Sequence, residues 1–264
     1  MLDETMVGSP PMGSEEVVLP SGGKFYGDAV PDGKVVIRPW TTEEEKLLLT
    51  ARRNREDVVD RVLDACLLTR TLPLKDYLVG DKACMLLALR CITLFPEYEF
   101  PAQCSQCGKT AKHVVDLKRD LITKRLIEED KETFKIKLPM CGKEVELRRL
   151  KGSDEITIRR EIKKRSSIDT SDGPDRGDPT YLHSLALAIV SIDGVVAEGD
   201  TARRLLEKPP LNGRDSLFLQ KAINDNECGV DLAFTITCPQ CNFEWSVEVP
   251  MTDEFFRPRT YPGG

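Results

Sequence analysis

Residues 19–24 read LPSGGK, and the same pattern returns at residues 138–143 as LPMCGK. In each place Leu-Pro leads into a glycine-containing turn, and a strand-like segment follows, VVIR at 35–38 and VELR at 145–148. Glycine at such turns supplies backbone conformations that other residues adopt poorly. The two stretches therefore predict the same β-hairpin at two points of the chain.

The segments after the two hairpins also correspond. TTEEE at 41–45 and KGSDE at 151–155 both place small polar and acidic residues where a helix would begin. Hydroxyl groups there accept hydrogen bonds from free backbone N–H groups, and carboxylates face the positive end of the helix dipole. Each hairpin is therefore predicted to lead into a helix.

A third correspondence joins an aspartate to a pair of cysteines. Asp81 precedes Cys104 by the same 23 residues that separate Asp215 from Cys238. An ordered series of this kind is typical of internal duplication. We therefore predict an α+β fold of two halves related by pseudo-twofold symmetry, each with β-hairpins, helices and a CxxC zinc-knuckle hairpin.

The duplication sets the expected boundaries along the chain. The Pro/Gly-rich acidic start and the polar stretch SSIDTSDGPDRGDPT both have compositions typical of exposed, unpacked segments. The expected parts are a flexible N-terminal arm at 1–14, a first half at 15–133, a second half at 134–254 with an inserted loop at 166–180, and a C-terminal tail at 255–264.

The composition is that of an ordinary globular chain. Of its 264 residues, 40% are hydrophobic and 31% are charged, and the formal net charge is −6. The longest apolar stretches, Cys84–Leu89 and Leu185–Val190, are too short to cross a bilayer. The acidic start lacks the basic and apolar regions of a signal peptide, so we expect reduced cysteines in a cytosol. Under those conditions paired cysteines favour metal binding over disulfides.

The two CxxC pairs, Cys104/Cys107 and Cys238/Cys241, lie between strand-like segments. Structural zinc sites use four cysteine or histidine ligands in a tetrahedron, so each pair supplies half a site. If the two halves pack about a pseudo-twofold axis, the four thiolates enclose one zinc per chain. Such a closed site leaves no open coordination position, and the zinc is therefore predicted to be structural.

The chain offers little for catalysis. It has two histidines, His113 and His183, and no phosphate-binding loop, zincin motif or nucleophile elbow. We therefore predict no enzymatic activity, no catalytic residues and no small-molecule substrate. Two alternatives to the four-cysteine site stay open, namely knuckles that are stable without metal and His113 as a substitute ligand. The second is disfavoured because the counterpart of His113 in the other half is Val247.

One strongly charged run remains, with five basic residues between Arg159 and Arg165. On a helix, residues three or four apart share a face, so several of these side chains would project together. Such a run is typical of a solvated helix face. The alternative is a docking surface for an acidic partner or for nucleic acid.

The stretch VVLPSGGKFYGD at 17–28, followed by KVVIRPWTTEEEKLLL at 34–49, resembles the T-even-type phage baseplate hub proteins, which are hub subunits or hub assembly proteins. Their pattern is a strand ending in LPSxGxxY, then a short strand and an acidic-capped helix. The resemblance implies a protein without enzymatic activity that acts in the assembly or architecture of a contractile tail baseplate. It also implies other baseplate or tail proteins as partners, no membrane, and a location in the virion tail, with the host cytoplasm during assembly.

Two functions of other classes compete with this interpretation. A zinc-ribbon-like nucleic-acid-binding module would use the CxxC hairpins and the basic run, but the net charge of −6 disfavours it. A redox or hydrolytic enzyme would need reactive thiols or a site centred on histidine. Thiol titration discriminates here, because cysteines bound to zinc stay protected until a chelator is added.

Overall fold

The computed structural model describes residues 11–50, 55–168, 179–197, 202–203, 206, 211–250 and 253–257. The chain forms two compact units. The first unit comprises Met1–Thr71, Ala83–Lys124 and Gly229–Gly264, and the second comprises Leu72–Lys82 and Arg125–Cys228. Most of the expected arm at 1–14 and of the expected loop at 166–180 lies outside the described residues.

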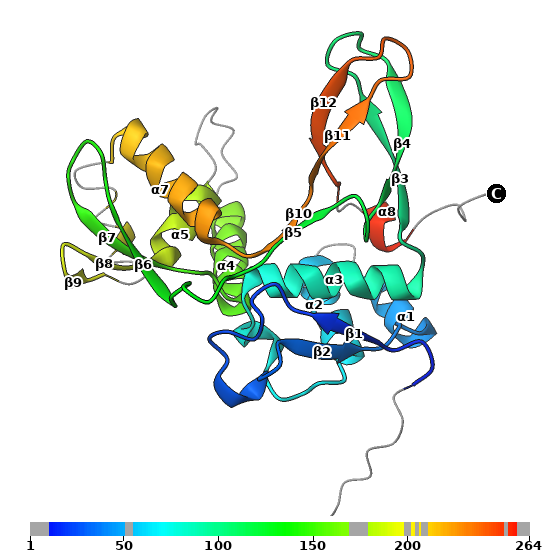
Figure 1. The fold of residues 1–264 in the computed structure, drawn as a ribbon, viewed down its shortest axis with the longest axis horizontal. Helices are drawn as coiled ribbons and strands as arrows, with labels where there is room; N and C mark the ends of the chain where they lie inside the picture. The colour runs from blue at the N-terminus through cyan, green and yellow to red at the C-terminus, as the bar shows by residue number, and fades with distance from the viewer. Residues whose placement is uncertain are drawn as a thin grey trace, which may run out of the picture. The chain divides into compact units, whose positions relative to one another are not determined.

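The first unit combines helices with two-stranded antiparallel sheets (Figure 1). Its strands are β1 (Glu15–Val18), β2 (Lys34–Ile37), β3 (Glu97–Gln103), β4 (Thr110–Asp116), β5 (Ile122–Lys124), β10 (Gly229–Asp231), β11 (Ala233–Thr237) and β12 (Glu244–Glu248). Its helices are α1 (Thr42–Thr50), α2 (Arg55–Cys66), α8 (Asp253–Phe256) and α3 (Val79–Thr93), the last of which begins in the second unit. The strand pairs are β1–β2, β3–β4, β5–β10 and β11–β12.

The LPSGGK stretch lies in the connection between β1 and β2. The Leu19 N–H extends this antiparallel pair with a hydrogen bond to the Gly33 oxygen (2.8 Å). Gly23 has a φ of +80°, and a Cβ there would lie 2.1 Å from the main-chain oxygen of Val30. Gly22 also has a positive φ, of +66°, but nothing lies within 4 Å of its Cβ position. Of these two glycines, Gly23 alone combines a positive φ with a close backbone approach.

This difference predicts unequal effects of alanine at the two glycines. Gly23→Ala is expected to destabilise the first unit by about 3 kcal/mol or more, because strain at positive φ adds to a clash with backbone atoms. Gly22→Ala carries only the conformational cost, about 1 kcal/mol. Urea unfolding of the two variants measures both free energies. Equal losses would show that the close approach at Gly23 does not constrain the turn.

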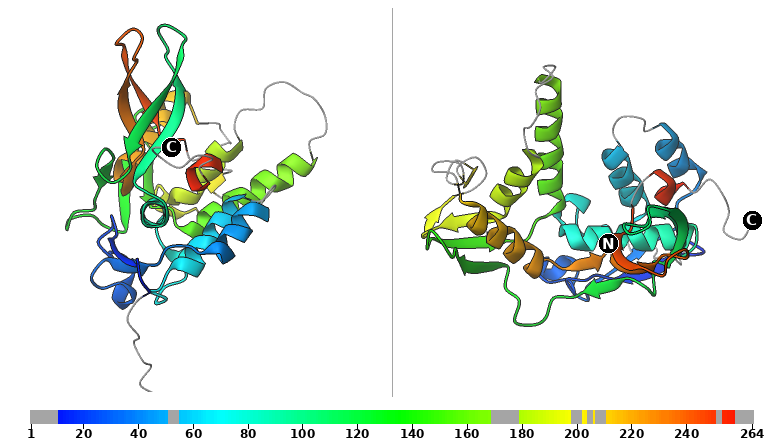
Figure 2. Two further views of the ribbon diagram at one scale, coloured as in Figure 1. Left: turned by 90° about the vertical axis from the view of Figure 1, so that its right-hand side faces the viewer. Right: turned by 90° about the horizontal axis from the view of Figure 1, so that it is seen from above.

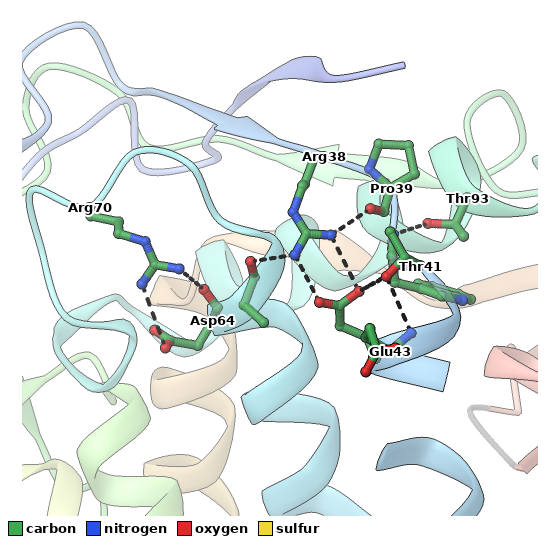
Figure 3. A network of polar contacts seen from close by, with 10 residues as sticks. Arg38, Pro39, Thr41, Glu43, Asp64, Arg70 and Thr93 are labelled. Carbon is green, nitrogen blue, oxygen red and sulfur yellow. Dashed lines mark hydrogen bonds and ion pairs between the residues drawn. The ribbon is translucent and has the colours of Figure 1, made fainter. Parts of the chain in front are cut away.

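An ion pair joins β2 to the start of α1 (Figure 3). The Arg38 guanidinium donates to both carboxylate oxygens of Glu44, at 2.8 and 3.3 Å, and to the main-chain oxygens of Pro39 and Ala65. Glu44 also accepts hydrogen bonds from the N–H and the hydroxyl of Thr41, which completes a capping box. The bonds from Arg38 lower the pKa of Glu44 to about 2, aided by Thr41 and against the effect of burial.

The low pKa of Glu44 predicts acid sensitivity of this junction. A pKa below the unfolded value of 4.5 means that the ionised carboxylate stabilises the fold above about pH 4.5 and loses this contribution as the pH falls toward 2. Glu44→Gln is therefore expected to cost about 2 kcal/mol at pH 7 and almost nothing near pH 2. Glu43→Gln is the matched control, since its side chain is exposed. A pH-independent difference between wild type and Glu44→Gln would contradict this prediction.

The second unit is built on one four-stranded antiparallel sheet in the order β6-β7-β8-β9. Its strands are β6 (Thr133–Lys137), β7 (Glu144–Arg148), β8 (Ile189–Ile192) and β9 (Val195–Val196), and its helices are α4 (Gly152–Ile168), α5 (Pro179–Ala188) and α7 (Gly213–Asn226). The core brings together Leu147 of β7, Ile189 of β8, Leu185 of α5 and Leu219 of α7, all of which are buried. Apolar side chains of the sheet and of two helices thus exclude water from a single cluster.

An ion pair at the start of α4 has the same form as the one at α1. The Arg148 guanidinium donates to both oxygens of Asp154, at 2.7 and 2.8 Å, and to the main-chain oxygen of Arg149. The Lys151 N–H donates to the same carboxylate at 2.8 Å. The end of β7 and the first turn of α4 are therefore held together through one buried carboxylate.

The mixture of helices with small antiparallel sheets confirms the predicted α+β class. The compact units divide the chain differently from the expected halves at 15–133 and 134–254, since β11 and β12 belong to the first unit. Compactness and repetition are different criteria, so the two halves stay a prediction.

The first residues of the expected tail at 255–264 pack into the first unit. Phe255 and Phe256 are buried in α8, and the Phe255 ring meets the Tyr98 ring edge to face, with centroids 5.1 Å apart. Fully buried Arg90 donates from Nε to the Phe255 main-chain oxygen at 3.0 Å. The end of α3, the root of β3 and α8 therefore form one packed cluster.

Candidate metal centre

The first CxxC pair lies in the tight turn between β3 and β4. The Cys104 N–H donates to the Lys109 oxygen and the Gly108 N–H donates to the Cys104 oxygen, both at 2.9 Å. Gly108 has a φ of +71°, which a glycine adopts without strain. This turn directs the side chains of Cys104 and Cys107 toward the second hairpin.

The second pair lies in a turn of the same form between β11 and β12. The Cys238 N–H donates to the Phe243 oxygen at 2.8 Å, and the Asn242 N–H donates to the Cys238 oxygen at 2.9 Å. Asn242 has a φ of +57°, and asparagine is one of the few residues other than glycine that tolerates this region. Two segments more than 100 residues apart in sequence thus adopt one local geometry.

The two hairpins lie side by side in the first unit, and Figure 2 shows them together after rotation of the view. Their inner faces pack through aromatic rings. The Phe100 and Phe234 rings meet edge to face with centroids 5.9 Å apart, and the His113 ring meets Trp245 in the same way at 5.8 Å. The sequence reasoning did not find this aromatic contact, although Phe100 and Phe234 each precede their CxxC by four residues.

The structure brings all four predicted cysteine ligands together. The Sγ atoms lie within 4.8 Å of one another. Two contacts cross between the hairpins at 3.7 Å, one from Cys104 to Cys241 and one from Cys107 to Cys238. A tetrahedral zinc with Zn–S bonds of about 2.3 Å places its sulfurs about 3.8 Å apart. The four sulfurs therefore have the spacing of a four-thiolate metal site.

Burial differs within the group. Cys104 and Cys238 are each 2% exposed, whereas Cys107 and Cys241 are exposed at the hairpin tips. Lys109 bridges the tips, with its Nζ 3.3 Å from the Gln240 side-chain oxygen. Each hairpin thus contributes one inner and one outer sulfur.

Thiols this close together influence one another's ionisation. Burial raises the pKa of Cys238, but hydrogen bonds from the N–H groups of Gln240 and Cys241 outweigh it and bring the value to about 7. At Cys241 the Phe243 N–H lowers the pKa, whereas burial and the neighbouring thiols raise it, to about 12. A bound cation would favour the thiolate form at every position of the group.

His113 takes no part in this group, which among the described residues contains cysteines alone. Its ring packs between Phe100 and Trp245, and its Nε2 has no hydrogen-bond partner within the described residues. His183, the other histidine, has no described side chain. The role of His113 is therefore in packing between the hairpins.

The basic run lies on α4 in the second unit. Arg160, Lys163 and Lys164 are exposed, and the Lys164 Nζ pairs with Glu161 at 2.7 Å. The Arg165 side chain lies outside the described residues. These contacts suit a solvated helix face, and the alternative of a docking surface stays open.

None of the described helices has the length and apolarity needed to cross a membrane. Neither the curated proteins nor the solved structures give a match to this chain. A protein-family model does match, that of the T4 bacteriophage base plate protein, over residues 13–174. The matched region is more than half of the chain and includes Cys104 and Cys107. The chain therefore belongs to the T4 bacteriophage base plate protein family.

Proposed function

We propose that this protein is a structural or assembly component of the hub of a contractile phage tail baseplate. It acts through contacts with other tail proteins and has no enzymatic activity. The observation that carries the proposal is membership of the base plate family, supported by the hub-like pattern around the LPSGGK stretch. A protein of this kind needs a rigid scaffold, and a metal held by the four cysteines would supply a crosslink within it.

The four cysteines bind one structural zinc in this proposal. Support comes from the donor set, since four thiolates suit zinc, and from the 3.7 Å contacts between the hairpins. Five cysteines elsewhere in the chain are outside the group. Metal at this position would crosslink β3–β4 to β11–β12, which belong to the second and third stretches of sequence that make up the first unit.

Internal duplication is the second part of the proposal. The ion pair of Arg38 with Glu44 has a counterpart in Arg148 with Asp154, at positions that are equivalent when VVIR at 35–38 is aligned with VELR at 145–148. In both cases a strand ends, the arginine bridges to the helix, and a backbone N–H binds the same carboxylate. Two unrelated helix starts would have no reason to share this arrangement, whereas two copies of one ancestral segment would.

The arrangement of the cysteines also supports the duplication. If Cys104 corresponds to Cys238 and Cys107 to Cys241, then exchanging the two hairpins converts each 3.7 Å contact into the other. The contact between Phe100 and Phe234 maps onto itself under the same exchange. A local twofold axis through the metal position accounts for both observations.

The hub role is tested by following the protein through tail assembly. Tails and tail precursors from infected host cells are separated by sedimentation and analysed by mass spectrometry. We expect this protein in one or both fractions together with other baseplate proteins, and presence in precursors alone would identify an assembly factor. Recovery only as a free monomer, absent from tails and precursors, would contradict the proposed function.

A further inference from the structure

The four-cysteine group consists of two cross-hairpin pairs rather than four equivalent thiols. In one pair the sulfurs of buried Cys104 and exposed Cys241 lie 3.7 Å apart. In the other, buried Cys238 and exposed Cys107 lie at the same distance. Each pair therefore presents one sulfur to solvent and keeps a second sulfur within reach of it.

We propose that a peroxide-class oxidant converts this group into two cross-hairpin disulfides and thereby releases the metal. The disulfides are Cys104–Cys241 and Cys107–Cys238. This inference rests on the metal-binding role proposed above and adds a redox regulation to it. The hairpins remain joined in the oxidised protein, because each disulfide links one hairpin to the other.

The chemistry follows from the exposure of one sulfur in each pair. The exposed thiolate attacks hydrogen peroxide, the O–O bond breaks, and the products are a sulfenic acid and hydroxide. The thiolate of the buried partner then attacks the sulfenic sulfur, the S–O bond breaks, and a disulfide forms with release of a second hydroxide. Each disulfide thus consumes one peroxide, which takes two electrons from two thiolates, and two protons from solvent turn both hydroxides into water.

Burial makes this reaction selective for the group. Cys66, Cys91 and Cys228 are buried and lie outside the group, so a dissolved oxidant has little access to their sulfurs. Cys141 is exposed but lies outside the group of four. It serves as an internal control for oxidation of an accessible thiol that lacks a nearby group of sulfurs.

The test is a titration of the purified full-length protein with hydrogen peroxide. Metal release is followed with a chromogenic chelator, and disulfides are mapped by mass spectrometry after free thiols are blocked. We expect about two peroxides per metal released, peptides crosslinked between the two hairpins, and recovery of metal binding after reduction in the presence of zinc. Crosslinks confined within each CxxC, or metal retained at peroxide levels that oxidise Cys141, would overturn the proposal.

Two double variants test the pairing without relying on the metal. Cys104→Ser with Cys241→Ser leaves the exposed–buried pair of Cys107 and Cys238, whereas Cys107→Ser with Cys241→Ser leaves two buried cysteines. The first is expected to form its disulfide about tenfold faster, because only it retains an exposed sulfur for the oxidant. Equal rates would overturn the proposed sequence of steps. A wild-type protein that never contains metal would contradict the zinc proposal alone, since the disulfide map still decides the pairing.

Discussion

Replacing Cys238 with serine is expected to lower the zinc content of the purified protein from about one per chain toward zero. A hydroxyl is a poor ligand beside three thiolates, so the remaining cysteines would not hold the metal tightly. Since the metal contributes its binding free energy to folding, we expect the free energy of unfolding to fall by several kcal/mol, about 3 or more. Elemental analysis and urea unfolding measure the two effects.

The segments that become sensitive to protease in Cys238→Ser distinguish the loss of a metal crosslink from a defect confined to one hairpin. The first unit is assembled from three separate stretches of sequence, and its last stretch carries Cys238. Loss of the crosslink should therefore expose both hairpins, β3–β4 and β11–β12, to protease, although only one of them is altered. Cys141→Ser is the matched control, because Cys141 is an exposed cysteine outside the group. A metal-free wild-type protein, or full zinc content in Cys238→Ser, would contradict the prediction.

The convergence of the cysteines could be predicted because a structural zinc needs four ligands, wherever those ligands lie in the sequence. Two CxxC pairs in one reduced chain are each half of a zinc site, and four sulfurs within 4.8 Å fit this expectation. The spacing alone did not predict which cysteine of one hairpin lies next to which cysteine of the other. The choice of Cys241 rather than Cys238 as the neighbour of Cys104 depends on how the hairpin faces pack, through contacts such as that of Phe100 with Phe234.

The α+β class could be predicted because turns and helix caps are local signals. Glu44, one of the acids at the start of α1, belongs to a capping box, and the glycines of LPSGGK adopt the positive φ that the turn requires. The compact units could not be predicted in this way. They depend on which distant segments exclude water together, and Phe255, placed in an expected tail, is fully buried in the first unit.

Arg90 is the clearest example of a residue that local patterns do not identify. It lies within the apolar stretch of α3 and is fully buried, where a charged side chain is rare. Its guanidinium donates to three main-chain oxygens, those of Phe255, Phe95 and Glu97. Its Cζ also lies 5.2 Å from the centre of the Tyr98 ring, within the range of a cation–π contact. One side chain therefore satisfies the acceptors at the end of α3, the root of β3 and α8.

Replacing Arg90 with methionine, which keeps much of the apolar stem, is expected to cost about 3–5 kcal/mol of unfolding free energy. Substituting a whole buried ion pair by apolar residues is often neutral, but here the acceptors belong to the main chain and remain buried without a donor. Arg90→Lys keeps the charge yet lacks the planar fork, so an intermediate loss is expected. Arg61→Met, at an exposed position on α2, should change stability by less than about 0.5 kcal/mol.

Hydrogen exchange identifies the origin of the loss at Arg90. If the arginine holds α8 in place, Arg90→Met should raise exchange in α8 and at the root of β3 in conditions where β1, β2 and the second unit remain protected. We expect this selective change because Arg90 donates to the main-chain oxygens of Phe95, Glu97 and Phe255, which lie in or next to these segments. A uniform increase across the first unit would instead show that Arg90 supports its core as a whole, and stability equal to that of Arg61→Met would contradict the role of the buried acceptors.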